Sequence, residues 1–116
     1  MKRSVNTVST VERHARMDQV KRLVVKIGSS SLTSRNNTLD RHVIKRLVKD
    51  VVNLRERGME VSIVTSGAVV AGMGRLGLET RPRAIATLQA MAAVGQNLLM
   101  HTYKTLFDHH QVASGQ

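Results

Sequence analysis

Residues 23–33 read LVVKIGSSSLT, a short apolar run that carries one lysine and ends in a glycine and three serines. The β-branched and aliphatic residues up to Ile27 predict a buried strand. Lys26 lies near the carboxyl end of that strand, where open α/β sheets bind their ligands. Gly28 leaves room for an anion, and the serines after it can donate to phosphate oxygens. An ordinary strand with a polar turn explains these residues equally well, because short glycine motifs often occur by chance.

The residues that follow predict a helix and a second strand. Residues 28–38 read as an exposed loop, and Thr38 or Asp40 can cap a helix that ends near Arg57, before Gly58. Apolar residues recur at helical spacing within it: Val43, Ile44, Leu47, Val48, Val51 and Leu54. Residues 61–65, VSIVT, predict the second strand. A strand, a helix and a strand at this spacing form a βαβ unit, so the two strands should be parallel.

The second predicted strand also ends in a hydroxyl group and a glycine, at Ser66, Gly67 and Ala68. Since the carboxyl ends of parallel strands meet at one edge of a sheet, the two loops should lie together. This coincidence indicates a ligand site more strongly than either loop alone.

The rest of the chain predicts two further helices. The small residues after Ala68 begin the first, and Pro82 can stand at the first position of a second that runs to about Phe107. One face of this second helix is marked by Ile85, Leu88, Ala92, Gln96 and Leu99. Gly95 is expected to be a packing position. The fold class is therefore α/β, and two parallel strands with so many apolar positions are typical of part of a larger doubly wound domain. We interpret the chain as the amino-terminal piece of a longer protein.

Composition excludes several classes of protein. The 116 residues form one domain at most, and the absence of cysteine excludes disulfides, thiolate metal sites and cysteine nucleophiles. No apolar run is long enough to span a bilayer. Residues 1–22 are expected to be a basic leader with little regular structure, and they lack the apolar core of a secretory signal. A cytoplasmic location is predicted. The histidines show no arrangement typical of metal ligands, so no metal-binding residue is predicted in this chain.

Positive charge is concentrated in the first half of the chain. The net charge is +10, and residues 1–57 hold fourteen Lys and Arg against five acidic residues. Such a surface can attract polyanions, including nucleic acid. Proteins that bind single-stranded nucleic acid usually also stack the bases on aromatic side chains, yet the only Phe, Tyr or Trp residues here are Tyr103 and Phe107. A solvated helix face explains the charge better, and a basic nucleic-acid-binding module is kept as an alternative.

Three segments together resemble a known family. VVKIGSSSLT (24–33), VSIVTSGAVVAG (61–72) and LQAMAAVGQNLLM (88–100), in this order, are similar to the start of the bacterial glutamate 5-kinases, a branch of the amino-acid kinase superfamily. Other branches usually show a second glycine after the lysine strand and a run of glycines after the second strand. Ser29 and Ser66 stand at the corresponding places here. The resemblance therefore favours this branch over the acetylglutamate, aspartate, uridylate and carbamate kinases.

The resemblance implies a three-layer α/β/α fold with a mainly parallel sheet, of which residues 23–116 are the amino-terminal part. It implies ATP-dependent phosphorylation of the γ-carboxylate of L-glutamate, the first step of proline biosynthesis, with Mg²⁺ as cofactor. It also implies a homo-oligomer when full length and possible feedback inhibition by proline. No membrane partner is predicted, and the sequence does not favour a nucleic-acid partner. Another amino-acid kinase, such as an acetylglutamate kinase, is the alternative.

Site residues follow from the same resemblance. Lys26 matches the lysine that contacts the transferring phosphate, and Gly28 and Ser29 match the loop beneath the phosphates. Ser66, with Gly67 and Ala68, matches the loop that grips glutamate. The acidic and asparagine residues that complete the substrate and Mg²⁺ sites are expected beyond residue 116, so the isolated chain should be inactive.

Overall fold

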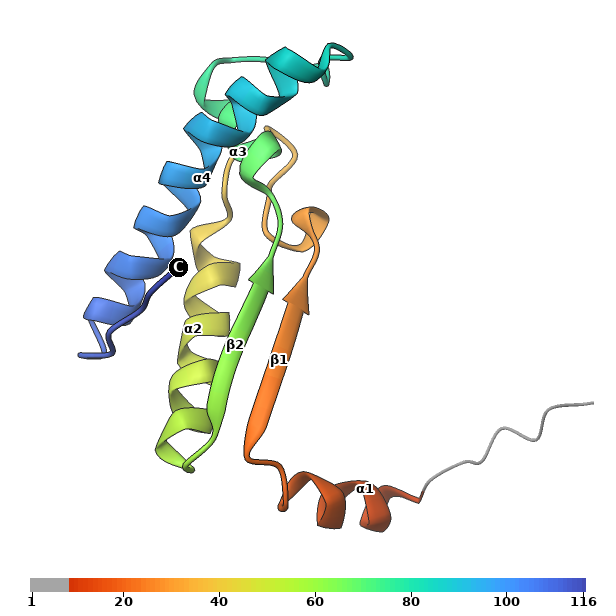
Figure 1. The fold of residues 1–116 in the computed structure, drawn as a ribbon, viewed down its shortest axis with the longest axis vertical. Helices are drawn as coiled ribbons and strands as arrows, with labels where there is room; N and C mark the ends of the chain where they lie inside the picture. Colours follow the sequence, from red (N-terminus) through yellow and green to blue (C-terminus); the bar gives the residue numbers. More distant parts are fainter. Residues whose placement is uncertain (1–8) are drawn as a thin grey trace, which may run out of the picture.

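A parallel pair of strands, joined by a helix and flanked by a second long helix, forms the centre of the computed structural model, which describes residues 9–116 (Figure 1). The elements follow in the order α1 (Thr10–Met17), β1 (Arg22–Ile27), a 3₁₀ helix (Ser29–Ser31), α2 (Arg41–Glu56), β2 (Glu60–Thr65), α3 (Ala68–Arg75) and α4 (Ile85–Asp108). Among the described residues, no helix is both long enough and apolar enough to cross a membrane.

The two strands pair in parallel along their whole length, with Arg22 opposite Glu60 and Ile27 opposite Thr65. The predicted βαβ unit is therefore confirmed. Alternate residues of each strand are partly buried, and the residues between them are exposed. The outer face is open in the described part of the chain, since Val24 and Val64 are 65% and 52% exposed. Of the three layers expected, the described residues supply the sheet and the helices on one face.

Local sequence explains the bounds of α2. The Asp40 side chain caps the helix, because one Oδ1 atom accepts hydrogen bonds from the backbone N–H groups of His42 and Val43 at 3.0 and 3.1 Å. At the other end Gly58 has a φ of +84°, a left-handed conformation that favours glycine and ends the helix. Both predicted helix signals are confirmed.

The core lies between α2, α4 and the inner face of the sheet. Ile44 and Leu99, one from each helix, are 0% and 1% exposed. The buried cluster around them comprises Leu32, Val48, Val51, Val52, Tyr103, Leu106 and Phe107. Most of the apolar stripe predicted for α2 is therefore in the core, and Val52 joins it from just outside that stripe.

Three local predictions were wrong, and the first concerns the leader. Residues 10–17 form α1, although little regular structure was expected before the first strand; residues 1–8 lie outside the described part of the chain. Ser9 and Glu12 form a capping box, in which each side chain accepts a hydrogen bond from the other residue's backbone N–H, at 2.9 and 3.2 Å. That S-x-x-E signal is readable in the sequence and had been overlooked.

The second correction concerns the loop between β1 and α2, which was expected to be exposed throughout. Leu32 is fully buried within it, and the Asp40 backbone N–H donates to the Leu32 carbonyl at 2.8 Å. The loop therefore contributes an apolar anchor that fixes its path over the core.

The third correction concerns the start of α4. The helix begins at Ile85 rather than beside Pro82, after Ala84 in an extended conformation. Ile85 itself is 73% exposed, so it does not belong to the buried face predicted for it. The buried positions are Met91, Gly95, Leu99, Thr102, Tyr103, Leu106 and Phe107. In a helix with many alanines and glycines, the faces differ little in hydrophobicity. Which face is buried therefore depends on the helix that packs against it.

The helix that crosses α4 is α3, and glycines let the two backbones touch. A Cβ atom at Gly95 would overlap the carbonyl oxygen of Ala68, and one at Gly72 would overlap the carbonyl of Met91. Each glycine is therefore required for space rather than for backbone conformation. The prediction that Gly95 is a packing position is confirmed.

We expect Gly95→Ala to lower the free energy of unfolding by about 1–3 kcal/mol, because the new methyl group must displace backbone atoms of α3. At an exposed helix position the same change would stabilise by about 1 kcal/mol. Urea unfolding followed by circular dichroism measures the sign. Ala90→Gly, at an exposed position of the same helix, is the control for helix propensity. An unchanged or raised stability of Gly95→Ala would contradict the close crossing.

Candidate functional site

The loops that follow β1 and β2 meet at the carboxyl edge of the sheet. The backbone N–H of Ser66 donates to the carbonyl of Ile27 at 3.1 Å, and its Oγ donates to the same oxygen at 3.2 Å. A Cβ at Gly67 would lie 3.9 Å from the Cα and Cβ of Ser29. The structure therefore brings Ser29, Ser66 and Gly67 together, as the parallel strands led us to expect.

Gly67 makes the turn from β2 into α3. Its φ is +113° and its ψ is −3°, a backbone conformation that L side chains rarely adopt. The helix then begins at Ala68 with no side-chain cap on its first turn. Backbone N–H groups at a helix N-terminus and the positive end of its dipole both favour an anion. A ligand with a carboxylate or phosphate group suits this turn.

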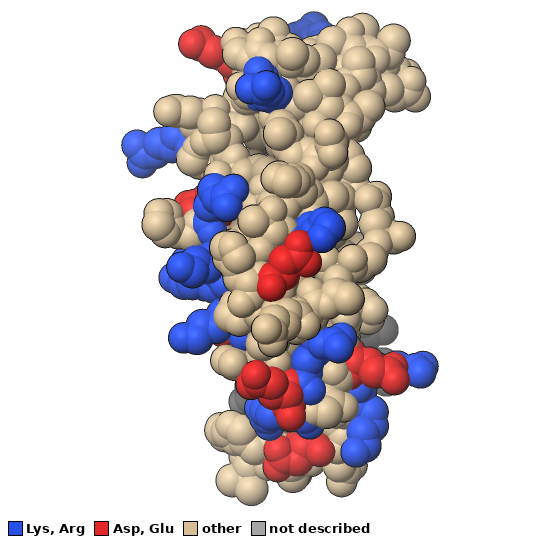
Figure 2. Space-filling model, turned by 90° about the vertical axis from the view of Figure 1, so that its left-hand side faces the viewer, with Lys and Arg blue, Asp and Glu red and all other residues tan. Residues whose placement is uncertain are grey.

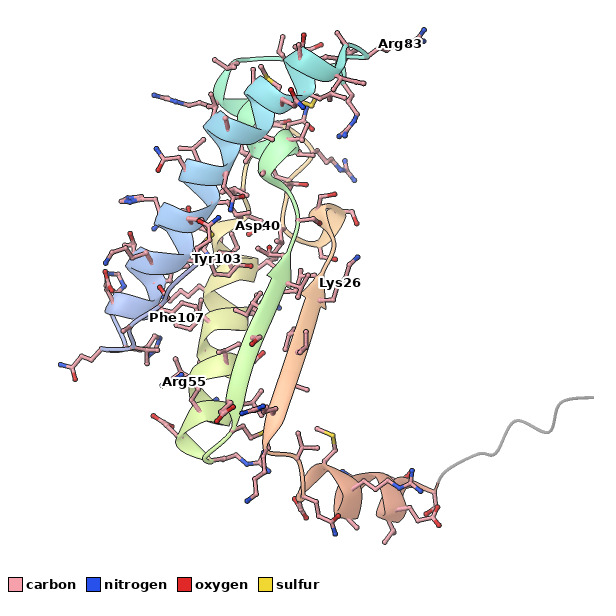
Figure 3. The ribbon with its side chains drawn as sticks, in the orientation of Figure 1. Lys26, Asp40, Arg55, Arg83, Tyr103 and Phe107 are labelled. Atoms are coloured by element: carbon pink, nitrogen blue, oxygen red, sulfur yellow. The ribbon has the colours of Figure 1, made fainter. Side chains whose placement is uncertain are left out.

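Lys26 lies on the outer face of the sheet, at the end of β1 (Figure 3). Its side chain is exposed, and within residues 9–116 it takes part in none of the ion pairs. The Nζ atom lies 4.0 Å from the position that a Cβ at Gly28 would occupy. Gly28 has a φ of −77° and a ψ of 156°, which any residue can adopt. Neither the backbone conformation nor the available space therefore requires glycine at residue 28, because a Cβ atom there would make only an ordinary contact with the ammonium group.

Helix α4 reaches the same edge of the sheet from the buried side. The hydroxyl of Tyr103 lies 3.3 Å from Oγ1 of Thr65, the last residue of β2 (Figure 3). Burial raises the pKa of Tyr103, and the hydrogen bond with Thr65 offsets part of that rise, so the phenol is protonated at neutral pH. Sequence reasoning missed this pair. Its only local signal is that Tyr103 and Phe107, the two aromatic residues of the chain, both occur near the end of this mainly aliphatic helix.

A groove of about 660 Å³ lies elsewhere on the described residues. It runs along β2 between α4 and residues 112–116, and it is lined by Thr65 and Tyr103 but not by Lys26, Gly28 or Ser66. The meeting point of the loops is therefore separate from this groove.

Comparison with known proteins identifies the family. The sequence model of the amino acid kinase family matches residues 21–116. The chain belongs to the amino acid kinase family. Similar proteins include enzymes named glutamate 5-kinase from Clostridium tetani, 46% identical over 86% of this chain, and from Moorella thermoacetica, 46% identical over 90%. A third, from Halalkalibacterium halodurans, is 48% identical over 82% of this chain. The aligned parts span 38%, 28% and 25% of these relatives' lengths.

Membership of a kinase family implies a nucleotide, typically with a metal ion, and the described residues fit these two groups unequally. Lys26 and the two glycine loops offer a cation and backbone donors, which suit phosphate oxygens. Within residues 9–116, however, no group of three or more His, Asp or Glu side chains lies close enough together to hold a metal ion. The described residues of this amino acid kinase therefore carry groups that suit phosphate oxygens, whereas candidate metal-binding side chains are not clustered among them.

The charge of this family member is spread over exposed helix surface. Lys and Arg side chains gather along one margin of the face in Figure 2, and acidic side chains are interspersed toward one end. The exposed positions of α2 include Arg41, Lys45, Arg46 and Lys49. Both aromatic residues are buried, Tyr103 at 3% and Phe107 at 6% exposure, so neither can stack on a base. The structure thus favours a solvated helix face over a nucleic-acid surface.

Proposed function

We propose that these residues form the amino-acid-binding part of a glutamate 5-kinase, which transfers the γ-phosphoryl group of ATP to the γ-carboxylate of L-glutamate. The observation that carries the proposal is the junction of the two loops, where Ser66 is hydrogen-bonded to the carbonyl of Ile27 and Gly67 lies beside Ser29. The names of the similar enzymes support glutamate as the acceptor. The reaction would be the first step of proline biosynthesis.

The arrangement suits phosphoryl transfer to a carboxylate. Such a reaction requires little covalent chemistry from the protein, which must align donor and acceptor and stabilise negative charge. In this proposal the Ser66–Ala68 turn and the N-terminus of α3 bind a glutamate carboxylate. Gly28 and Ser29 lie beneath the phosphates of ATP. Lys26 places its ammonium group near the oxygens of the transferring phosphoryl group.

Further parts of the proposal concern the longer protein. Mg²⁺ would neutralise phosphate charge, and its ligands would come from outside the described residues. Location in the cytoplasm, assembly into a homo-oligomer and feedback inhibition by proline are proposed from the family alone. No observation favours acetylglutamate as the acceptor, and the experiment below includes it.

The test is a hybrid enzyme in which residues 21–116 replace the matching segment of the Clostridium tetani glutamate 5-kinase. We expect ATP-dependent acyl phosphate formation, trapped as the hydroxamate, with L-glutamate and not with N-acetylglutamate. The 116-residue chain alone is the control and should show no turnover. A folded hybrid that is inactive with glutamate, or prefers N-acetylglutamate, would reject the proposed acceptor.

In the hybrid enzyme, Ser66→Ala should raise the KM for glutamate more than the KM for ATP. The hydroxyl now donates to the Ile27 carbonyl, and it can donate instead to a substrate carboxylate. A hydrogen bond to a charged group contributes about 1.5–3 kcal/mol, which corresponds to roughly a 10- to 100-fold change. Ser62→Ala, at an exposed position of β2, is the matched control. If only the KM for ATP rose, Ser66 would contribute to ATP binding and not to glutamate binding, which would contradict the prediction.

Lys26→Met should lower kcat by about 100-fold or more, because the ammonium group stabilises charge that develops in the transition state. Lys26→Arg keeps the charge but changes its reach, and should restore part of the activity. Lys49→Met removes an exposed lysine of α2 and should leave kcat unchanged. Turnover per folded enzyme is the measurement, and a normal kcat with lower stability would show that Lys26 serves packing only.

A further inference from the structure

A short chain of hydrogen bonds links the buried side of α4 to the loop after β2. The Thr65 hydroxyl donates to the carbonyl oxygen of Ser66 at 3.3 Å, and the Tyr103 hydroxyl lies 3.3 Å from the same Thr65 oxygen. A hydroxyl group has one proton, and that of Thr65 goes to Ser66. When both contacts form together, Tyr103 is therefore the donor to Thr65.

The tyrosine ring is held firmly enough to fix this chain. Tyr103 is 3% exposed and stacks on Phe107, with ring centroids 6.5 Å apart and an angle of 20° between the planes. Its hydroxyl is the only polar atom of the side chain, and it points to the end of β2 (Figure 3). Burial of the ring and its stacking on Phe107 leave that hydroxyl with little freedom.

A hydrogen bond to the Ser66 carbonyl orients the whole Ser66–Gly67 peptide group, because a peptide group is planar. Fixing the direction of that C=O also fixes the N–H of Gly67, which points the opposite way in the same trans peptide. Two turns earlier on α4, Gly95 contacts the carbonyl of Ala68. One helix thus supports both ends of the turn at residues 66–68, through a hydrogen bond at one end and backbone packing at the other.

We infer that Tyr103 is a positioning residue for the glutamate-binding turn, acting through the hydroxyl of Thr65 on the Ser66–Gly67 peptide. The inference rests on the proposed function for its substrate, whereas the hydrogen-bond chain itself rests on the structure. Tyr103 does not touch the reacting groups. Its role is to hold the backbone donors of the turn in the direction that an acceptor carboxylate needs.

Hydrogen–deuterium exchange of the hybrid enzyme, measured by mass spectrometry, tests the chain without reference to activity. Tyr103→Phe removes the donor and keeps the ring. We expect exchange in peptides covering residues 62–72 to accelerate about 3- to 10-fold, while peptides from residues 44–56 in α2 are unchanged. Thr65→Val removes the hydroxyl in the middle of the same chain and should give the same pattern.

The matched control is Thr102→Val. Thr102 is buried beside Tyr103 on α4, but its hydroxyl donates within the helix, to the Leu98 carbonyl at 2.9 Å. Thr102→Val should leave the ratio of the exchange rate of residues 62–72 to that of α2 unchanged. Equal acceleration in both regions, or none, in Tyr103→Phe would overturn the inference, because Tyr103 would then contribute only to overall stability.

Steady-state kinetics of the same variants test the role in binding. Tyr103→Phe should raise the KM for glutamate about 3- to 10-fold and leave the KM for ATP unchanged. Equal changes in both constants, or in neither, would overturn the positioning role. If the unaltered hybrid does not phosphorylate glutamate, the proposed function fails, and the exchange result still decides whether Tyr103 holds the turn.

Discussion

The parallel pairing of β1 with β2 is the constraint on which the rest of the structure depends. With Ile27 opposite Thr65, the two strands end at the same level, and the loops that follow start side by side. The Ser66 backbone continues the pairing by one more hydrogen bond, to the carbonyl of Ile27. Had the strands been antiparallel, these loops would lie at opposite ends of the sheet. The register of the two strands therefore places the residues assigned to phosphate and to substrate at the same edge of the sheet.

The crossing of α3 and α4 gives the candidate site a rigid support. Backbone contact at Gly72 and Gly95 allows no side chain between the helices, so α3 cannot shift without moving the longer helix. The helix that packs into the core thereby fixes the N-terminus of the helix that faces the site. A similar contact joins the end of α3 to the first loop, where a Cβ at Gly74 would overlap the carbonyl of Asn37. The Asn37 side chain also donates to the Leu78 carbonyl at 3.2 Å.

The outer face of the sheet explains why the site is open. Lys26 shares this face with Val24 and Val64, which are both more than half exposed in the described part of the chain. Parallel sheets are normally covered on both faces, because their strands are apolar on both sides. The aligned residues span only 38% or less of the relatives reported above. In the proposed function, the rest of the nucleotide site and the metal ligands are accordingly assigned to residues outside this segment.

The sequence by itself determined the elements and their order. The apolar runs, the Asp40 cap, Gly58 and the glycine after each strand act locally, so they specify strands, a helix and parallel pairing without reference to distant residues. Local signals also predicted that Gly95 packs closely. The family resemblance then suggested a role for each loop residue, and those roles are still predictions.

Only the tertiary structure decided which face of α4 is buried and what supports the turn at residues 66–68. Alanines and glycines on several sides of α4 leave its hydrophobic pattern ambiguous, and the crossing with α3 resolves it at Gly95. The contact between Tyr103 and Thr65 joins residues 38 positions apart, which no local pattern encodes. Hydrogen bonds and close packing between distant segments depend on the folded path of the chain, and that path is set by the whole core at once.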